Sequence, residues 1–323
     1  MADRISRRTV GVGLAASAAA LAARPFDTAR ADTYPSRAIT IVVGTAPGGP
    51  TDTVSRAAAQ RLTERFKQNV LIENRAGASG NLAAQTVAKA EPDGYTLITL
   101  LAPLAQNQAT FKTPGFNIQQ DFKPIAHLAS TDMMIVGRPA LPFGTLAQLI
   151  AHAQAHPGTM SCGSQSPPQA EYLKKTIKVA FNVVPYRGSA LITNDVIAGQ
   201  IDLGLVPFSD VAQHIAAGTV KPLFNCGPKR IAKLPAIETV AESFPGFGFW
   251  SWYGIAAPAR TPDAVVAILR KEFGDIARSD DFRGFVSGLG LATVDAPDKF
   301  GDVIDAEVAL WKRLVDELSL PRI

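Results

Sequence analysis

Cysteine and histidine are scarce in this chain, and their scarcity excludes several kinds of site. Its 323 residues include two cysteines, Cys162 and Cys226, and four histidines. Two cysteines are no disulfide framework. The two cysteines could form a single disulfide bridge or remain two buried free thiols, and free thiols are the commoner outcome. His152 and His156 are four residues apart on a predicted helix, but no histidine has ligand spacing with the cysteines, so we predict no metal site.

Long apolar runs and an excess of charge are also lacking beyond the first segment. No later run of about 18 apolar residues could span a bilayer. The chain has 32 basic and 28 acidic residues, and five of the arginines and two of the acids lie in residues 1–31. The remainder therefore has 27 basic and 26 acidic residues, with no basic run longer than two. This balance argues against nucleic acid as a partner.

Signatures of catalysis and of nucleotide binding are missing as well. The chain contains no G-x-S-x-G nucleophile elbow, since Gly77-Ala78-Ser79-Gly80 is too short and has no assignable histidine or acid. It also lacks the Walker and G-x-G-x-x-G patterns. We therefore predict no cofactor and no catalytic residue, and a periplasmic hydrolase is the most remote alternative.

Residues 1–31 have the pattern of an export signal. Ser6-Arg7-Arg8 precedes an uncharged, moderately apolar stretch over residues 10–23, and Ala29-Arg30-Ala31 has small residues at signal-peptidase spacing. The paired arginines favour a twin-arginine signal, and an ordinary Sec signal with a basic start is the alternative. We expect cleavage before Asp32, no lipid anchor, and a soluble protein in a bacterial periplasm.

Short apolar segments alternate with helical patterns along most of the chain. We predict strands over residues 39–43, 70–73, 95–100, 159–162, 181–184, 202–206 and 221–224. Helical patterns lie between them, at residues 53–66, 82–90, 191–198 and 210–216, and residues 263–318 are mostly helical. This alternation predicts two α/β units with parallel sheets.

A glycine-rich turn, residues 44–50, follows the first predicted strand. It lies at the carboxyl end of a strand and the start of a helix, where backbone N–H groups and the helix dipole favour an anion. No lysine or arginine lies between Ile39 and Ser55, so a small carboxylate suits the turn better than a polyphosphate. The alternative is a plain turn with Thr51 or Asp52 capping the helix.

A second loop of small residues, Asn74 to Asn81, also lies between a predicted strand and a helix, and the two loops could face one site. Further motifs accompany them along residues 34–323. They are YPSRAITIVV from Tyr34, PGGPTD from Pro47, ENRAGASGN from Glu73, PDGYTL from Pro92, FGTLAQLI from Phe143, HPG from His156, VPYRG from Val184, AGQID from Ala198, WYGIAAP from Trp252 and TP from Thr261. In order and spacing, these motifs resemble the Bug receptors, the substrate-binding proteins of tripartite tricarboxylate transporters.

The resemblance implies a fold and a function. The fold would be a two-lobed, periplasmic-binding-protein-like α/β fold of type II, each lobe a parallel-rich sheet flanked by helices, with the ligand cleft between them. Lobe 1 would comprise residues 32–135 and 251–323 and lobe 2 residues 136–250, with crossings near 134–139 and 249–255. We expect a monomer that is not an enzyme and that delivers a small carboxylate to membrane permease subunits. A receptor of the same fold that feeds a membrane sensor kinase is the alternative.

In the Bug receptors two loops after the first strands hold the ligand carboxylate, partly through water. Carried over, the first-lobe contacts are Thr45, Ala46, Pro47, Gly48, Gly49, Thr51, Asp52, Gly77, Ala78, Ser79, Asn81 and Ala102. The second-lobe contacts are Ser164, Ser166, Tyr186, Arg187, and Ser209 or Asp210. Asp52 is expected to accept hydrogen bonds from helix N–H groups or from a ligand amine or hydroxyl. A plain surface charge is the alternative for Arg187.

Two segments depart from the pattern of the relatives. Residues 100–103 read Leu-Leu-Ala-Pro, where many relatives have a hydroxyl and small polar side chains. Residues 163–171 lack the glycines and the histidine of the second-lobe motif, and the following helix and loop look several residues short. These departures favour a ligand with a less polar far end, such as an aromatic acid, with a dicarboxylate also possible. Alternatively, the shorter loop alters only the rim of the lobe.

Overall fold

The computed structural model describes residues 34–320 and residue 322. The predicted export signal, residues 1–31, lies outside the described residues. Among the helices that are described, none is both long and apolar enough to cross a membrane.

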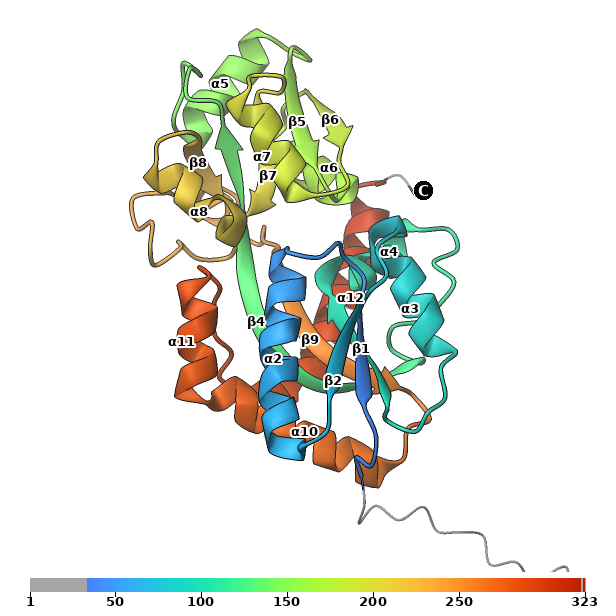
Figure 1. Ribbon diagram of the computed structural model, residues 1–323. Coiled ribbons are helices and arrows are strands. Elements are labelled where there is room, and N and C mark those ends of the chain that lie inside the picture. Colours follow the sequence, from blue (N-terminus) through green and yellow to red (C-terminus); the bar gives the residue numbers. More distant parts are fainter. Residues whose placement is uncertain (1–33, 321, 323) are drawn as a thin grey trace, which may run out of the picture. The chain divides into compact units, whose positions relative to one another are not determined.

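The described strands form one nine-stranded sheet that is shared by two lobes (Figure 1). Their order is β2-β1-β3-β9-β4-β7-β5-β6, and β8 pairs with β4. The bounds are β1 Ile39–Val43, β2 Val70–Asn74, β3 Thr96–Leu101, β4 Phe122–Gly137, β5 Met160–Ser164, β6 Phe181–Pro185, β7 Leu203–Pro207, β8 Lys221–Asn225 and β9 Trp250–Pro258. Strands β2, β1 and β3 are parallel in the first lobe, as are β6, β5 and β7 in the second.

Helices alternate with these strands, as the sequence predicts for an α/β fold. In the first lobe they are α2 Pro50–Phe66, α3 Asn81–Ala88, α4 Ala102–Thr110, α10 Asp263–Arg278, α11 Asp280–Gly288 and α12 Phe300–Glu317. In the second lobe they are α5 Leu146–Ala155, α6 Pro167–Thr176, α7 Ser189–Ile197, α8 Phe208–Ala216 and α9 Val240–Ser243. Helix α2 begins at Pro50, three residues before the predicted start, because proline fits the first helical position, whose N–H would be unpaired anyway.

Strand β4 passes from one lobe to the other. Its residues up to Asp132 pair with β9, and from Met133 onward it pairs with β7 and β8 instead. Strand β9 begins at Trp250, opposite Asp132. The two lobes therefore join where β4 changes partners and β9 begins.

The carboxyl-terminal half of α12 packs into the core of the second lobe. Trp311, Leu314 and Val315 belong to the same buried cluster as Met133 and Phe249. Residues 263–318 were predicted to be mostly helical, and α10, α11 and α12 lie there. The segment that returns to the first lobe thus contacts both lobes through α12.

The two cysteines are free and buried, which confirms the free-thiol alternative. Burial raises the pKa of the Cys162 thiol to about 12, so this thiol stays protonated and unreactive. The ring centroids of His152, on α5, and His156, the residue that follows α5, lie 4.6 Å apart. No group of three side chains that could hold a metal occurs among the described residues.

Gly254 of β9 lies where no side chain fits. A Cβ atom there would lie 2.4 Å from Cζ of Phe300 and 2.7 Å from the carbonyl oxygen of Ala126. We therefore expect Gly254→Ala to lower the free energy of unfolding by about 1–3 kcal/mol, the usual cost of overpacking. Urea unfolding measures this. Gly284→Ala on α11 is the control, because a Cβ there meets nothing within 4 Å. Equal stability of the two variants would contradict the packing described for β9.

Candidate functional site

Six helices begin at the carboxyl ends of parallel strands, and none of the six has a side-chain N-cap. Helices α2, α3 and α4 follow β1, β2 and β3, and α6, α7 and α8 follow β5, β6 and β7. No side-chain cap bond forms at any of them. Helices α10 and α12 also lack one, whereas Thr145, Thr239 and Ser279 cap α5, α9 and α11. Helix α6 begins with Pro167 and Pro168, which have no N–H, and the Gln169 N–H donates to the carbonyl of Ser166. The other strand-end helices leave backbone N–H groups available to an anion.

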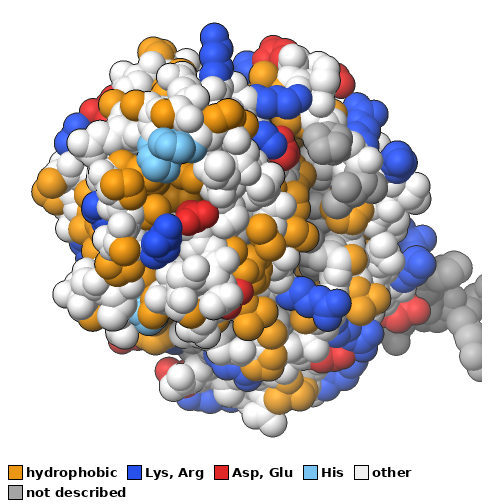
Figure 2. Space-filling model, turned by 90° about the horizontal axis from the view of Figure 1, so that it is seen from above, with side chains coloured by type: hydrophobic (Ala, Val, Ile, Leu, Met, Phe, Trp, Pro, Cys, Tyr) orange, Lys and Arg blue, Asp and Glu red, His pale blue; other side chains and the backbone are white. Residues whose placement is uncertain are grey.

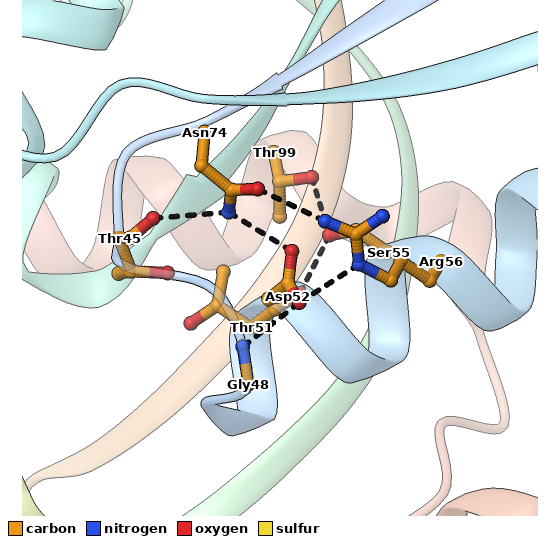
Figure 3. A network of polar contacts seen from close by, with 8 residues as sticks. All are labelled: Thr45, Gly48, Thr51, Asp52, Ser55, Arg56, Asn74 and Thr99. Atoms are coloured by element: carbon orange, nitrogen blue, oxygen red, sulfur yellow. Dashed lines mark hydrogen bonds and ion pairs between the residues drawn. The ribbon is translucent and has the colours of Figure 1, made fainter.

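The buried carboxylate of Asp52 holds the loop between β1 and α2 through hydrogen bonds (Figure 3). Its Oδ2 accepts from the Gly48 N–H at 3.0 Å and from Arg56 Nε at 2.9 Å, and its Oδ1 accepts from Asn74 Nδ2 at 2.9 Å. Burial alone would raise the pKa of Asp52, but the bonds from Arg56, Gly48 and Asn74 outweigh it and lower the pKa. Asp52 is therefore an anion whose oxygens are already engaged.

The alternative that Thr51 or Asp52 caps α2 is wrong. The N-cap is Gly49, and it makes no side-chain bond. Helix N–H groups were one of the two kinds of donor predicted for Asp52, the other being a ligand amine or hydroxyl. Asp52 lies in the first turn and accepts from the N–H of Gly48, which precedes the helix. The reason is that the chain turns at Gly48, whose φ is +89° and which brings its own N–H toward Asp52.

Asn74 joins the two predicted loops, although the sequence analysis did not include it in the site. Its Nδ2 donates to the carbonyl of Thr45 at 3.1 Å as well as to Asp52, and its Oδ1 accepts from Arg56 Nη2 at 3.0 Å. The only signal for it was its position, at the end of a strand and the start of the second small-residue loop. Asn74 therefore fixes the end of β2 against the loop that follows β1.

Two threonine hydroxyls in the first loop remain available. The Thr45 Oγ1 atom is buried and has no hydrogen-bond partner among the described residues. Thr51 is 5% exposed, and only its backbone carbonyl is engaged, by Ser55 Oγ at 2.6 Å. An unpaired buried hydroxyl costs about 1–3 kcal/mol. A polar ligand that reached Thr45 would recover that cost.

The glycines of the first loop leave its surface open. A Cβ at Gly48 or at Gly49 would meet nothing within 4 Å, and Ala46 and Pro47 are exposed. The left-handed position is Gly48, because Gly49 has an ordinary φ of −78°. Close approach to the backbone is possible at both glycines.

The second loop is held in an uncommon conformation. Gly77, Ala78, Ser79 and Gly80 all have positive φ, at 151°, 46°, 55° and 92°. Two consecutive non-glycine residues in this region cost about 1–3 kcal/mol each, and such strain concentrates at functional sites. The Asn81 side chain is committed elsewhere, because its Oδ1 accepts from Asn107 Nδ2 at 2.7 Å.

The third strand end contributes a buried apolar surface. Ala102 is the first residue of α4 and is fully buried. Leu101, the last residue of β3, is 7% exposed and extended, so this edge offers no side-chain hydroxyl.

In the second lobe, the hydroxyls of Ser164 and Ser166 are already engaged. Ser164 Oγ donates to the carbonyl of Ser166 at 2.9 Å and accepts from the Ser166 N–H at 3.1 Å. Ser166 Oγ donates to Gln106 Oε1 of α4, in the first lobe, at 3.0 Å. The two serines therefore shape the loop before α6 and connect it to the opposite lobe.

Tyr186 and Arg187 differ in their partners. The Tyr186 hydroxyl donates to Asp195, and burial followed by the nearby Asp195 charge raises the pKa of Tyr186 to about 12. Arg187 is exposed and forms no hydrogen bond or ion pair with a described residue. Within the part of the chain that the structure describes, its guanidinium is thus a cation without a partner.

Asp210 lies at the start of α8, where two serines donate to it. Ser189 Oγ of α7 donates to Oδ2, and Ser209 Oγ donates to Oδ1 at 3.0 Å. Burial raises the pKa of Asp210. Burial raises the pKa of Tyr253 on β9, and the nearby charge of Asp210 raises the pKa of Tyr253 further. Tyr253 belongs to the WYGIAAP segment but was not predicted as a site residue.

Two further cavities lie beside Trp250, away from the predicted contacts. One, of about 340 Å³, is lined by residues of α12 together with Trp250, and the other, of about 170 Å³, by residues of β4 with Pro228, Trp250 and Ala292. None of the predicted ligand contacts lines either cavity. They leave room around Trp250, where the lobes join.

Charged side chains of both signs are scattered over the face seen in Figure 2, with apolar side chains between them. Lysines and arginines do not gather into one patch on this face. The distribution agrees with the near-neutral charge of the chain after residue 31.

Comparison with known proteins places this geometry in a family. Residues 54–320 match the model of the tripartite tricarboxylate transporter family receptor. The protein BugT of Bordetella pertussis is 30% identical over 296 residues, which cover 89% of this chain and 91% of BugT.

Solved structures agree with the sequence relatives. R. palustris Rpa4515, solved with adipate, has a TM-score of 0.81 and 30% identity, covering 88% of this chain and 97% of its own. MatC (Rpa3494) from Rhodopseudomonas palustris, solved with bound malate, has a TM-score of 0.80 and 28% identity, covering 87% and 100%. These matches confirm the two-lobed α/β fold of type II. Because the family consists of substrate-binding receptors, the prediction that the chain is not an enzyme is also confirmed. The chain belongs to the Bug receptors, the receptor family of the tripartite tricarboxylate transporters.

Proposed function

We propose that the protein is a periplasmic solute-binding protein that captures a small carboxylate between its two lobes. The observation that carries this proposal is the first-lobe loop, where the buried Thr45 hydroxyl has no partner among residues 34–320 and lies beside the uncapped start of α2. A carboxylate accepts hydrogen bonds only, so it complements hydroxyl and N–H donors. The relatives solved with adipate and with malate support the same ligand class.

The first carboxylate group would be held by Thr45, Thr51 and the backbone around Gly48 and Gly49. Asp52 would not contact it, since Asp52 is an anion engaged by Gly48, Arg56 and Asn74. Its role would be to keep the loop in shape. The left-handed Ala78 and Ser79 would present their backbone from the second loop.

The far end of the ligand would meet the second lobe. Arg187 has no partner among the described residues, and it could pair with a second carboxylate. Leu101, which is 7% exposed, instead provides an apolar edge that suits a carbon chain or ring, whereas Ala102, the next residue in the chain, is fully buried. We therefore favour an apolar dicarboxylate such as adipate, with an aromatic monocarboxylate as the second candidate.

Closure of the lobes would complete the site. We propose that one lobe comprises residues 32–135 with 251–323 and the other residues 136–250. The chain would bend between them at two places, where β4 changes partners after Asp132 and where β9 begins at Trp250. The protein would act as an exported monomer that delivers its ligand to membrane permease subunits. A receptor that feeds a membrane sensor kinase is the alternative, and a neighbouring gene for a permease or for a kinase would distinguish them.

A thermal-shift screen tests the ligand class. The screen would contain mono-, di- and aromatic carboxylates, with amines and sugars of similar size as controls. A ligand at one hundred times its dissociation constant should stabilise the folded protein by about 2.7 kcal/mol. Stabilisation by a control class and by no carboxylate would overturn the proposal.

Thr51→Val should weaken binding of the carboxylate found in that screen by about 1.5–3 kcal/mol, the scale of a hydrogen bond to a charged group. The valine keeps the shape of the side chain, so the free energy of unfolding should change little. Calorimetry measures the affinity, and Thr63→Val, on the same helix far from the loop, is the control. Unchanged affinity in a folded Thr51→Val protein would remove Thr51 from the site.

A further inference from the structure

Glu307 on α12 is a buried carboxylate whose Oε1 atom accepts two hydrogen bonds. The residue is 2% exposed, and Oε1 accepts from Trp311 Nε1 at 2.7 Å and from Gln106 Nε2 at 3.4 Å. Both donors are neutral, and Glu307 forms no ion pair with a described residue. Burying a carboxylate without a cation is costly. The arrangement therefore requires a reason beyond packing.

Gln106, one of the two donors to Glu307, leads to the opposite lobe. Because the Gln106 amide nitrogen faces Glu307, its oxygen faces away and accepts from Ser166 Oγ at 3.0 Å. Ser166 is the N-cap residue of α6. A chain of three polar side chains thus runs from α12 through α4 to the first turn of α6.

Trp311, the other donor to Glu307, also leads to α6. Trp311, oriented by its bond to Glu307, meets the ring of Tyr172 edge to face, with centroids 6.1 Å apart and an interplanar angle of 78°. Tyr172 lies in the middle of α6. Both partners of Glu307 therefore act on α6, one at its start and one at its centre.

We infer that Glu307 is a positioning residue that holds α6 of the second lobe against the first lobe. Its acceptor oxygen sets the amide of Gln106 and the indole of Trp311, and through them the loop from Ser164 to Ser166. That loop lies at the carboxyl end of β5, among the strand ends proposed to face the ligand. Its relevance to the ligand rests on the proposed function, whereas the positioning of α6 does not.

Two substitutions of similar volume distinguish the role of Glu307 as a hydrogen-bond acceptor from the role of its charge. Glu307→Gln keeps an oxygen where Oε1 lies and removes the charge, and Glu307→Met removes the acceptor. Native-state amide hydrogen exchange without added ligand compares α6 with α7, a helix of the same lobe. We expect Glu307→Met to speed exchange in α6 about tenfold, the scale of a lost buried hydrogen bond, and to leave α7 unchanged. With exchange measured at pH 4.5, where Glu307 is protonated and the two proteins should be nearly equal in stability, Glu307→Gln should behave like the unsubstituted protein.

The two branches can be cut one at a time. Gln106→Leu should speed exchange mainly in the first turn of α6, and Trp311→Phe, which removes the Nε1 donor, mainly around Tyr172. If Glu307→Met speeds exchange equally in α6 and α7, Glu307 contributes only to overall stability and the inference is wrong. If Glu307→Gln resembles Glu307→Met, the acceptor geometry is not what matters, and the inference is equally wrong. Because no ligand is present, neither outcome depends on whether carboxylates bind.

Discussion

Asp52→Ala should lower the free energy of unfolding at pH 7 by about 1.5–3 kcal/mol, the scale for hydrogen bonds to a charged group. The substitution removes the acceptor of three bonds, from the Gly48 N–H, Arg56 Nε and Asn74 Nδ2. Arg56 can return to water because its side chain is 51% exposed, so most of the loss should come from the other two donors. Urea unfolding of the apo protein measures the difference.

The Asp52 carboxylate also predicts that the protein loses stability in acid. The folded-state pKa of Asp52 is lowered from its ordinary value of 3.8. Its contribution is therefore present above pH 3.8 and is lost as the pH falls through the lower, folded-state pKa. Asp52→Ala should flatten this part of the pH profile. Arg56→Ala is the control and should cost no more than about 1 kcal/mol. An Asp52→Ala protein as stable as Arg56→Ala would contradict the role given to Asp52.

Glu307→Gln should make the protein more stable by about 3 kcal/mol at pH 8 and leave it nearly unchanged at pH 4.5. Burial raises the pKa of Glu307 from 4.5 to about 7 in the folded protein. The folded state therefore binds this proton more tightly than the unfolded state, and stability falls as the pH rises from 4.5 to 7. Each unit of pKa difference corresponds to about 1.4 kcal/mol.

Other titratable groups near Glu307 should not mask this effect. His127 of β4 has a pKa lowered by burial to about 4, and burial raises the pKa of Tyr172 on α6, so both are neutral between pH 5 and 8. Lys299 and Asp302, which line the same cavity as Glu307, have mostly exposed side chains. Unfolding measured at pH 4.5, 6 and 8 checks the prediction. An equal stability difference at every pH would show that Glu307 does not titrate as described.

The sequence predicted the strands of the alternating units well, because each is a short apolar segment, whereas helices α4 and α6 were not among the predicted helical patterns. All seven predicted strands are present, with ends shifted by no more than two residues. The long strands β4 and β9 were foreseen only as crossings. Strand β4 is buried on both faces for most of its length and changes register twice against β9, so its apolar residues do not alternate.

The candidate site could be predicted only in part. The loops after β1 and β2 follow from local signals, namely glycines and small residues between a strand and a helix. The bond from Asn74 to Asp52 joins residues 22 positions apart, and the bond from Gln106 to Glu307 joins residues 201 apart. Neither pair has a local pattern. The fold brings them together, and only the structure reveals that Ser164 and Ser166 serve the loop itself.

The most direct test of carboxylate binding is a calorimetric titration with a matched pair of ligands. The carboxylate that stabilises the protein most in the thermal-shift screen would be compared with its amide, which keeps the shape and loses the charge. The account predicts that the carboxylate binds at one site and that the amide binds at least about tenfold more weakly, because hydrogen bonds to a charged group are the stronger ones. Equal affinity for the acid and its amide would contradict the claim that this chain is a receptor for carboxylates.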